Sequence, residues 1–128
     1  MQLKRICLAL LLAGALHGQP APTELYLRGY SVIPSPQKVT LRDADVQIDD
    51  TWQVGGPAES IATKWLVSDL ESFHSLKLKR VATPGERAIT LRVRPGAVTG
   101  APEETAPQAY HLSIREGRIE IVANADAG

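Results

Sequence analysis

The sequence predicts an α+β domain in which one main helix packs on one face of a mixed or antiparallel sheet of about five to seven strands. Two observations support this fold class. Apolar residues recur at steps of three and four over Ala58–His74, which indicates one face of a helix. In the flanking segments they recur at steps of two, which indicates strands. Since one helix rarely covers such a sheet, part of its apolar face is expected to lack a cover.

Residues 1–18 have the order of a secretory signal peptide. Lys4 and Arg5 precede an apolar run that is too short to span a bilayer, and small residues follow it. Cleavage after Ala15 and cleavage after Gly18 both fit this order. We therefore expect an exported protein, periplasmic or secreted.

Residues 19–31 are expected to form a leader whose proline-bearing start, residues 19–22, stays extended, and the domain itself is expected to span residues 32–128. Cys7 is the only cysteine and lies in the signal segment. After cleavage no disulfide and no thiol nucleophile would remain, which fits an exported domain that packing stabilises.

The charge balance excludes one large class of partners. The chain has 14 basic and 14 acidic residues, and the loss of Lys4 and Arg5 would leave 12 against 14, a net charge near −2. It has no long basic run and little aromatic interleaving, so the electrostatic footprint of nucleic-acid binding is missing. No apolar segment after the signal is long enough for a membrane span.

Two short strands, paired or nearly so, are predicted after the segment Pro34-Ser35-Pro36, which favours an extended entry. Val39 and Leu41 alternate with polar residues, and Val46 and Ile48 do the same. The residues between these pairs offer a turn.

The helix is predicted over about Ala58–His74. Pro57 suits its first turn, and Glu59 favours the positive end of the helix dipole. Its predicted core face consists of Ile61, Ala62, Trp65, Leu66, Leu70 and Phe73. We interpret this face as packing surface rather than as a ligand-binding stripe.

Two more strands are predicted around Leu76–Val81 and Ile89–Val93, and the composition from Pro95 to Pro107 predicts an exposed loop. A hairpin follows, with Glu116-Gly117 as a two-residue turn. In that register every apolar residue falls on one face, whereas a slip of one residue would mix the faces. The predicted pairs are Arg115 with Arg118, Ile114 with Ile119, Leu112 with Ile121, and Tyr110 with Ala123.

A search for catalytic groups yields no site, so no catalytic residue, metal ligand or cofactor is expected. The chain has no glycine-rich phosphate loop, no His-Glu-x-x-His helix and no Gly-x-Ser-x-Gly elbow. His74 is interpreted as a helix-end residue and His111 as a surface residue. Two scattered histidines cannot assemble a zinc site without further ligands.

The acidic pairs give no better candidate. Asp49-Asp50 and Glu103-Glu104 are adjacent in sequence, and adjacent side chains on an extended backbone diverge. General acid and base catalysis instead needs two carboxylates that converge on one bond. Asn124 and Asp126 are typical of a turn that caps a following helix.

The opening "VIPSPQKVTL" and the closing "AYHLSIREGRIEIVANADAG" resemble the N-terminal accessory domain of bacterial β-N-acetylhexosaminidases, family 20 of the glycoside hydrolases. The resemblance covers about Val32 to Gly128. The residues that carry it are Pro34-Ser35-Pro36, Ala109-Tyr110-His111-Leu112, Gly117-Arg118-Ile119 and the exit from Ala123 to Gly128. The chain departs from the pattern at Gln108, where an acid is common in the family.

The resemblance implies a division of labour between domains. In such enzymes the next segment forms a helix that packs on this sheet and leads into a (β/α)8 barrel. The barrel carries an Asp-Glu pair that hydrolyses amino-sugar glycans with assistance from the substrate's acetamido group. No residue of that pair maps onto this chain, which we therefore expect to be a domain truncated before its barrel and inactive alone.

Three alternatives remain open from the sequence. Related accessory domains precede barrels in α-glucuronidases, which leaves the sugar undecided. A free-standing carbohydrate-binding module would need a row of exposed aromatic side chains, and Trp65 and Tyr110 fall on predicted apolar faces. An independent interaction domain would use the uncovered sheet face to bind a partner chain.

Overall fold

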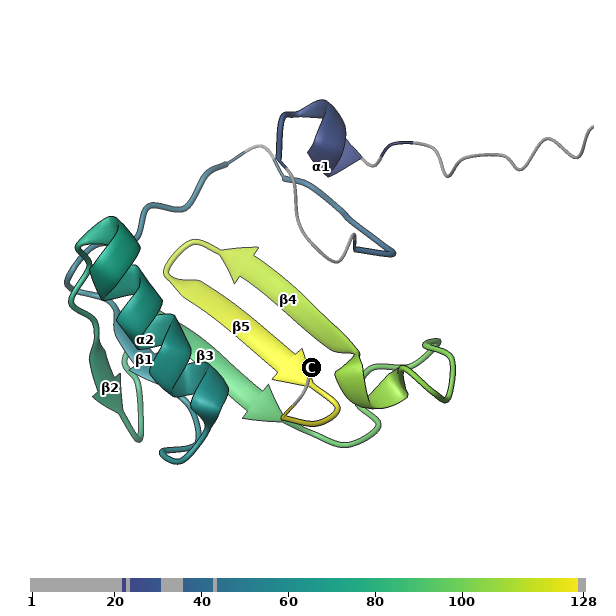
Figure 1. The fold of residues 1–128 in the computed structure, drawn as a ribbon. Helices are drawn as coiled ribbons and strands as arrows, with labels where there is room; N and C mark the ends of the chain where they lie inside the picture. Colours follow the sequence, from purple (N-terminus) through teal and green to yellow (C-terminus); the bar gives the residue numbers. More distant parts are fainter. Residues whose placement is uncertain (1–21, 23, 31–35, 43, 127–128) are drawn as a thin grey trace, which may run out of the picture. The chain divides into compact units, whose positions relative to one another are not determined.

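The structure, a computed structural model, describes residue 22 and residues 24–30, 36–42 and 44–126 (Figure 1). These residues divide into two units, with the boundary between residues 43 and 44. The predicted signal segment, residues 1–18, lies outside the described residues. No helix among the residues described has the length and apolar character needed to cross a membrane.

The first unit forms a helical turn after residues 19–22, the range predicted to be extended, of which the structure describes only Pro22. Its helix α1, Glu24–Leu27, is a single turn. Glu24 accepts a hydrogen bond from the Arg28 guanidinium at 2.8 Å, the spacing of four residues that one helical turn brings together. Proline dominates only the start of the leader, so the residues after it are free to turn.

The second unit contains one mixed sheet with the strand order β2-β1-β3-β5-β4 (Figure 1). The strands are β1 (Gln53–Gly55), β2 (Lys79–Val81), β3 (Ala88–Val93), β4 (Tyr110–Arg115) and β5 (Arg118–Ala123). Only the β4–β5 pair of this sheet is antiparallel. Together with the main helix α2 (Ile61–His74), this sheet confirms the predicted fold class.

The hairpin has the predicted register. Tyr110 pairs with Ala123, Leu112 with Ile121, and the remaining pairs follow to the turn. Gly117 has φ +69°, which a glycine adopts without a steric penalty. A short 3-10 helix, η1 (Ala106–Gln108), precedes the hairpin inside the segment that was predicted as a plain loop.

The two strands predicted at Val39–Leu41 and Val46–Ile48 are wrong. Residues 36–42 and 44–50 contain no regular strand, although Val46 and Ile48 pack against the core. Alternation reports that one side of an extended segment is buried, and it does not require a hydrogen-bonded neighbour. A strand forms instead at β1, a segment for which no strand was predicted.

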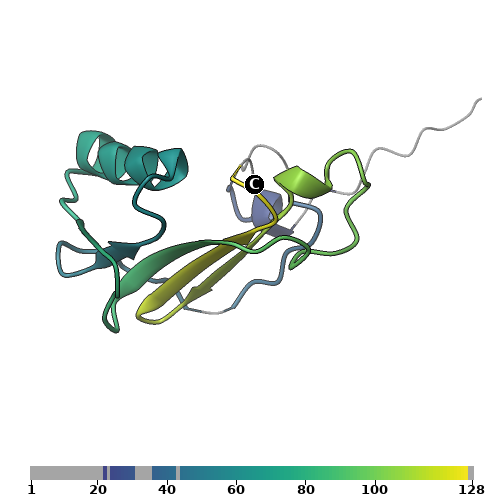
Figure 2. The same cartoon turned by 90° about the horizontal axis from the view of Figure 1, so that it is seen from below.

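The connections between the parallel strands cross the sheet on opposite faces. The chain passes from β1 through α2 to β2 on one face, and Figure 2 shows the helix on that side. On the other face the β2–β3 loop crosses β1. There the Gly85 N–H donates to the Gln53 side chain at 2.8 Å, and a side chain at Gly55 would clash with Pro84.

The helix begins at Ile61, three residues later than predicted, because Ser60 is the N-cap. Its hydroxyl accepts the Thr63 N–H at 3.4 Å. Ser75 ends the helix in the left-handed conformation, and the Leu76 N–H donates to the Leu70 carbonyl at 3.0 Å.

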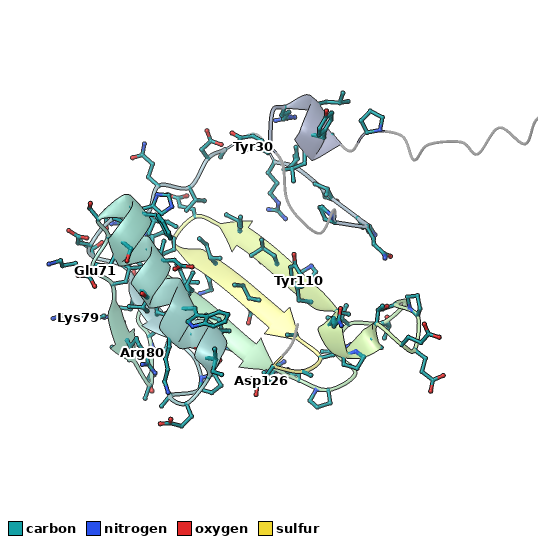
Figure 3. All side chains as sticks on the ribbon, in the orientation of Figure 1. Tyr30, Glu71, Lys79, Arg80, Tyr110 and Asp126 are labelled. Carbon is teal, nitrogen blue, oxygen red and sulfur yellow. The ribbon has the colours of Figure 1, made fainter. Side chains whose placement is uncertain are left out.

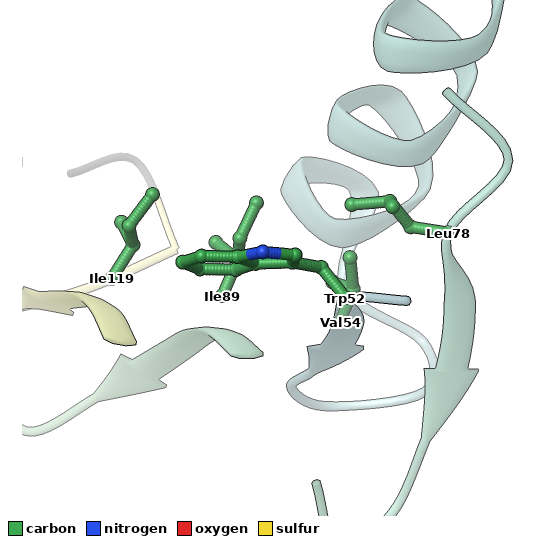
Figure 4. Packing of buried hydrophobic residues seen from close by; sticks show 5 residues of the cluster. All are labelled: Trp52, Val54, Leu78, Ile89 and Ile119. Carbon is green, nitrogen blue, oxygen red and sulfur yellow. The ribbon is translucent and has the colours of Figure 1, made fainter. Parts of the chain in front are cut away.

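The core lies between α2 and the β1–β3 part of the sheet (Figure 4). Its buried members are Trp52, Val54, Leu78, Ile89 and Ile119. The helix contributes Leu66, Val67 and Leu70. Trp52 is the largest of the fully buried side chains and is 1% exposed.

Candidate interaction surface

The face that α2 turns to the core is only partly the one predicted: Leu66 and Leu70 pack on the core, and the other predicted members do not. Trp65 is 69% exposed and Phe73 is 78% exposed, and Ile61 is exposed as well. The buried stripe runs through Thr63, Leu66, Val67 and Leu70, which also recur at steps of three and four. The sequence of α2 therefore holds two overlapping apolar stripes.

The caps and the sheet decide between the two stripes. Ser60 and Ser75 fix both ends of α2, and the Arg80 guanidinium of β2 donates to the carbonyl of Ala58 just before the helix. With its ends held, the helix turns Val67 to the core and Trp65 outward. On an ideal helix, Trp65 and Val67 are two positions and therefore about 200° apart, so they cannot both be buried against one sheet.

A second exposed apolar area lies on β4. Leu112 and Ile114 are 47% and 52% exposed, and Tyr110 is also exposed. They pair with Ile121, Ile119 and Ala123, so they point to the same side of the sheet as the core residue Ile119. That side is the one on which α2 lies, but α2 covers β1 and β3 and leaves the β4–β5 hairpin open (Figures 1 and 2).

Within residues 44–126, the predicted gap in the cover of the sheet is therefore present. We name the combined area the helix-side apolar surface. It consists of Ile61, Trp65 and Phe73 of α2, Val93 of β3, and Tyr110, Leu112 and Ile114 of β4. Exposed apolar patches are typical of protein or membrane interaction sites and of ligand-binding grooves.

The hollows around the sheet are poor candidates for an active site. One, of about 30 Å3, lies between the first turn of α2 and Asp126 and holds no more than a water molecule or two. A second, of about 370 Å3, lies at the ends of β1 and β3. Arg92 and Arg94 line it, and it has no carboxylate and no histidine. Arg92 and Asp126 both line the first hollow, but neither hollow contains a pair of carboxylates that could act as general acid and base.

Asp49 and Asp50 diverge as predicted, and each binds a different segment. Asp49 accepts hydrogen bonds from the hydroxyl and the N–H of Thr51 and from Arg87 at 3.2 Å. These bonds, that from the Thr51 hydroxyl first, lower the pKa of Asp49 below its ordinary value. Asp50 accepts the backbone N–H of Lys77 at 3.1 Å. Both carboxylates thus hold loops.

The other titratable candidates lie far from one another in sequence and on exposed positions. His74 is at the end of α2, and His111 is on the face of β4 opposite Leu112. Glu103 and Glu104 lie exposed in the loop before η1. Within the described ranges, no three histidine, cysteine or acidic side chains are grouped so that they could hold a metal ion.

Asp126 and Asn124 have different surroundings in the structure. Asp126 is exposed just beyond β5 (Figure 3). The Asn124 amide instead binds backward, to the backbone of Val98 and Ala106. The signal that could have indicated this role is the long polar segment before the hairpin, which needs some group at the end of β5 to hold it.

Comparison with known protein families identifies the family of this chain. The sequence matches the family model described as glycosyl hydrolase family 20, domain 2, over residues 29–128. The matched range includes the whole sheet, α2 and the helix-side apolar surface. No curated protein matches the chain.

Proposed function

The chain belongs to glycosyl hydrolase family 20 as a domain 2, as its opening and closing motifs implied, and we propose that it is the non-catalytic accessory domain of an exported β-N-acetylhexosaminidase. The observation that carries the proposal is the helix-side apolar surface on a domain of this family. Such a surface suits docking to another domain and offers no group that could cleave a glycosidic bond.

The proposed partner is a catalytic (β/α)8 barrel of the same enzyme. The barrel would supply the Asp-Glu pair for hydrolysis of terminal N-acetylhexosamine residues, and the domain would supply a packed apolar face. Trp65 and Phe73 are the aromatic side chains of α2 best placed for this contact, because both project from the core into solvent. Aromatic side chains of this kind dominate the energy of protein interfaces.

Export is proposed from residues 1–18 alone. The order of basic, apolar and small residues in that segment supports a cleavable signal. Expression in a bacterium, followed by mass spectrometry of the periplasmic fraction, tests it. A mature chain that begins at residue 16 or 19 is expected, and retention of Met1 in an unprocessed cytoplasmic chain would contradict export.

The docking role is tested by mixing the purified chain with the separately expressed catalytic domain of a family-20 enzyme. We expect the chain alone to release no chromophore from a chromogenic N-acetylglucosaminide. We expect the mixture to be more resistant to heat inactivation than the catalytic domain alone. Trp65→Lys should remove that protection, whereas His111→Asp, on the opposite face of the sheet, should preserve it.

Turnover by the chain alone would overturn the proposal and redirect attention to Asp126 and the pair Glu103-Glu104. Protection that survives Trp65→Lys would place the docking surface elsewhere. Circular dichroism is the control for folding of the variants. Their spectra should match the spectrum of the parent, because Trp65 and His111 are both exposed.

One observation favours a second function, binding of a glycan by the accessory domain itself. Trp65 was predicted on a core face, yet it is exposed, as is Phe73 two turns along α2. Exposed aromatic rings stack on sugar faces in carbohydrate-binding modules. Retention of the chain on insoluble chitin, lost on Trp65→Ala, would support this function, and equal retention of both would refute it.

A further inference from the structure

The helix-side apolar surface has two parts that complement each other. α2 covers half of the sheet and presents Ile61 and Trp65 on its outer side. No helix of the described residues 44–126 lies on the β4–β5 half of the same sheet face, which presents Leu112 and Ile114 (Figure 1). Each chain thus carries both a helix with a free apolar side and a sheet half that lacks a helix.

We propose that two copies of this chain form a closed dimer in which α2 of each copy packs on the β4–β5 half of the other. A two-fold axis running along the strand direction brings the two sheet faces together. It places each helix beside its partner and beneath the uncovered half of the partner's sheet. The contact is isologous, so it stops at two copies.

The outward direction of Ile61 and Trp65 fits this arrangement. On α2 the buried residues Thr63, Leu66 and Val67 cluster on one side, and Ile61 and Trp65 project almost opposite to them at 100° per residue. A helix between two sheets needs apolar residues on just these two opposite sides. Farther along α2 the same outer side carries Ser68 and Ser72, so its apolar part is the first half of the helix.

The available area is sufficient for a weak dimer. Trp65, Phe73 and Tyr110 offer on the order of 400 Å2 of exposed aromatic surface per copy, from about 200 Å2 for a fully exposed ring. The four aliphatic members bring the total over two copies to roughly 1,200 Å2, the lower end for stable specific interfaces. With 14 basic and 14 acidic residues in the chain, net repulsion between copies is small.

The dimer does not rest on the glycosidase proposal, because it is argued from the exposed side chains of the chain alone. What does rest on that proposal is competition, since the same surface would serve the catalytic domain. A second copy and the catalytic domain would then exclude each other, and the dimer would be the form that the chain takes without its enzyme partner.

Sedimentation equilibrium of the purified chain over about 1 to 100 µM, the range for an interface of this size, tests the dimer. We expect a monomer–dimer equilibrium. Trp65→Lys and Leu112→Asp should each raise the dissociation constant about 30-fold or more, as loss of a central interface residue does. His111→Asp, the neighbour of Leu112 on the opposite face, should leave it unchanged.

Mixing the two variants distinguishes the reciprocal arrangement from other contacts. In a mixed dimer one interface pairs Lys at position 65 with Asp at position 112, and the other interface is unaltered. The mixture should therefore dimerise more tightly than either variant alone.

A monomer at every concentration, or assemblies that grow beyond two copies, would overturn the proposal. A dimer that persists in Trp65→Lys would also overturn the proposal. Such a dimer would be held together without α2, for example by pairing of the β4 edge strands of two copies. These outcomes concern the chain alone, so they leave the heat-protection test of the catalytic partner independent.

Discussion

Asn124 holds the backbone of Val98 at both of its polar groups. The Asn124 Oδ1 accepts the Val98 N–H at 2.8 Å, and its Nδ2 donates to the Val98 carbonyl at 2.8 Å. The same Nδ2 donates to the carbonyl of Ala106 at 2.9 Å. A single amide side chain thus pairs with the loop as a neighbouring strand would, and it fixes the segment between β3 and β4 to the end of β5.

Replacement of this residue tests its role as a loop clamp. Asn124→Ala removes three hydrogen bonds and leaves partly buried backbone groups unpaired, so we expect a loss of about 2 kcal/mol in the free energy of unfolding. Urea denaturation measures that loss. Amide hydrogen exchange at Val98 should accelerate more than exchange in β5.

Gln108 provides the matched control. Its side chain is exposed in the same loop region, so Gln108→Ala should change stability by less than about 0.5 kcal/mol. Asn124→Asp should destabilise at least as much as Asn124→Ala, because a carboxylate cannot donate to the two carbonyls. Unchanged protection at Val98 in Asn124→Ala would contradict the clamp.

The Asn124 contacts are a part of the fold that the sequence pattern did not predict. Periodicity predicted the β4–β5 hairpin to the residue, because a register slip there would expose a whole apolar set. It had no means to predict that a side chain after β5 binds a loop 26 positions earlier. Long-range contacts of polar side chains leave no period in the sequence.

Gly55 is required by the crossing of the β2–β3 loop. A Cβ at this position would lie 2.7 Å from Pro84 Cγ, and a proline ring cannot move away without its backbone. Gly55→Ala should therefore cost about 1–3 kcal/mol of stability, the usual range for overpacking. Differential scanning calorimetry measures the change.

Gly85, in the same loop, is the control for Gly55. A Cβ there would meet only the Gln53 side chain at 3.7 Å, so Gly85→Ala should be nearly neutral. The double variant Gly55→Ala with Pro84→Ala should recover part of the loss. If Gly55→Ala proved as stable as Gly85→Ala, the loop would not cross β1 where the structure places it.

Thr63 occupies a core position that an apolar residue would fill better. It is 1% exposed, and its hydroxyl has no hydrogen-bond partner in the described part of the chain. Thr63→Val keeps the shape and removes an unsatisfied buried hydroxyl, so it should stabilise the domain by about 1 kcal/mol. A rise in the urea midpoint with an unchanged slope would show this, and a fall would indicate that the hydroxyl has a partner.

Protonation of Asp49 makes the stability of the domain depend on pH. Its pKa is lowered in the folded state, first by the Thr51 hydroxyl, so its contribution to stability is present above the pKa of an unfolded aspartate, about 3.9. That contribution disappears as the pH falls through the lower folded value. Asp49→Asn should therefore be slightly less stable than the parent at neutral pH, with the difference closing below about pH 4.

Thermal melts from pH 7 down to strongly acidic pH measure this difference. Asp69→Asn removes one exposed carboxylate from α2 without affecting Thr51, and it should not change how the stability difference varies with pH. A difference between Asp49→Asn and the parent that stays constant as the pH falls would contradict the assignment.

Helix α2 was predicted correctly, but the prediction of which of its residues face the core was only partly correct. The period of three and four predicted α2, but both Trp65 and Val67 belong to stripes with that period. The choice between them depends on the caps at Ser60 and Ser75 and on which strands lie beneath, and these are tertiary facts. The interaction surface was therefore predictable as an uncovered sheet, whereas its helical half was not.

Fluorescence of the two tryptophans can show which stripe of α2 packs against the core. Trp52 is 1% exposed and Trp65 is 69% exposed, so the variants Trp65→Phe and Trp52→Phe each leave one reporter of known burial. With Trp52 alone, emission should be blue-shifted and acrylamide should quench it weakly. With Trp65 alone, emission should be red-shifted and quenching strong at low protein concentration, where the chain is monomeric.

As the concentration rises, quenching of Trp65 should fall, because the proposed dimer buries that ring against the partner's β4. Quenching that is strong for Trp52 and weak for Trp65 would show that α2 turns its other stripe to the core, and the helix-side apolar surface would then lose its helical half.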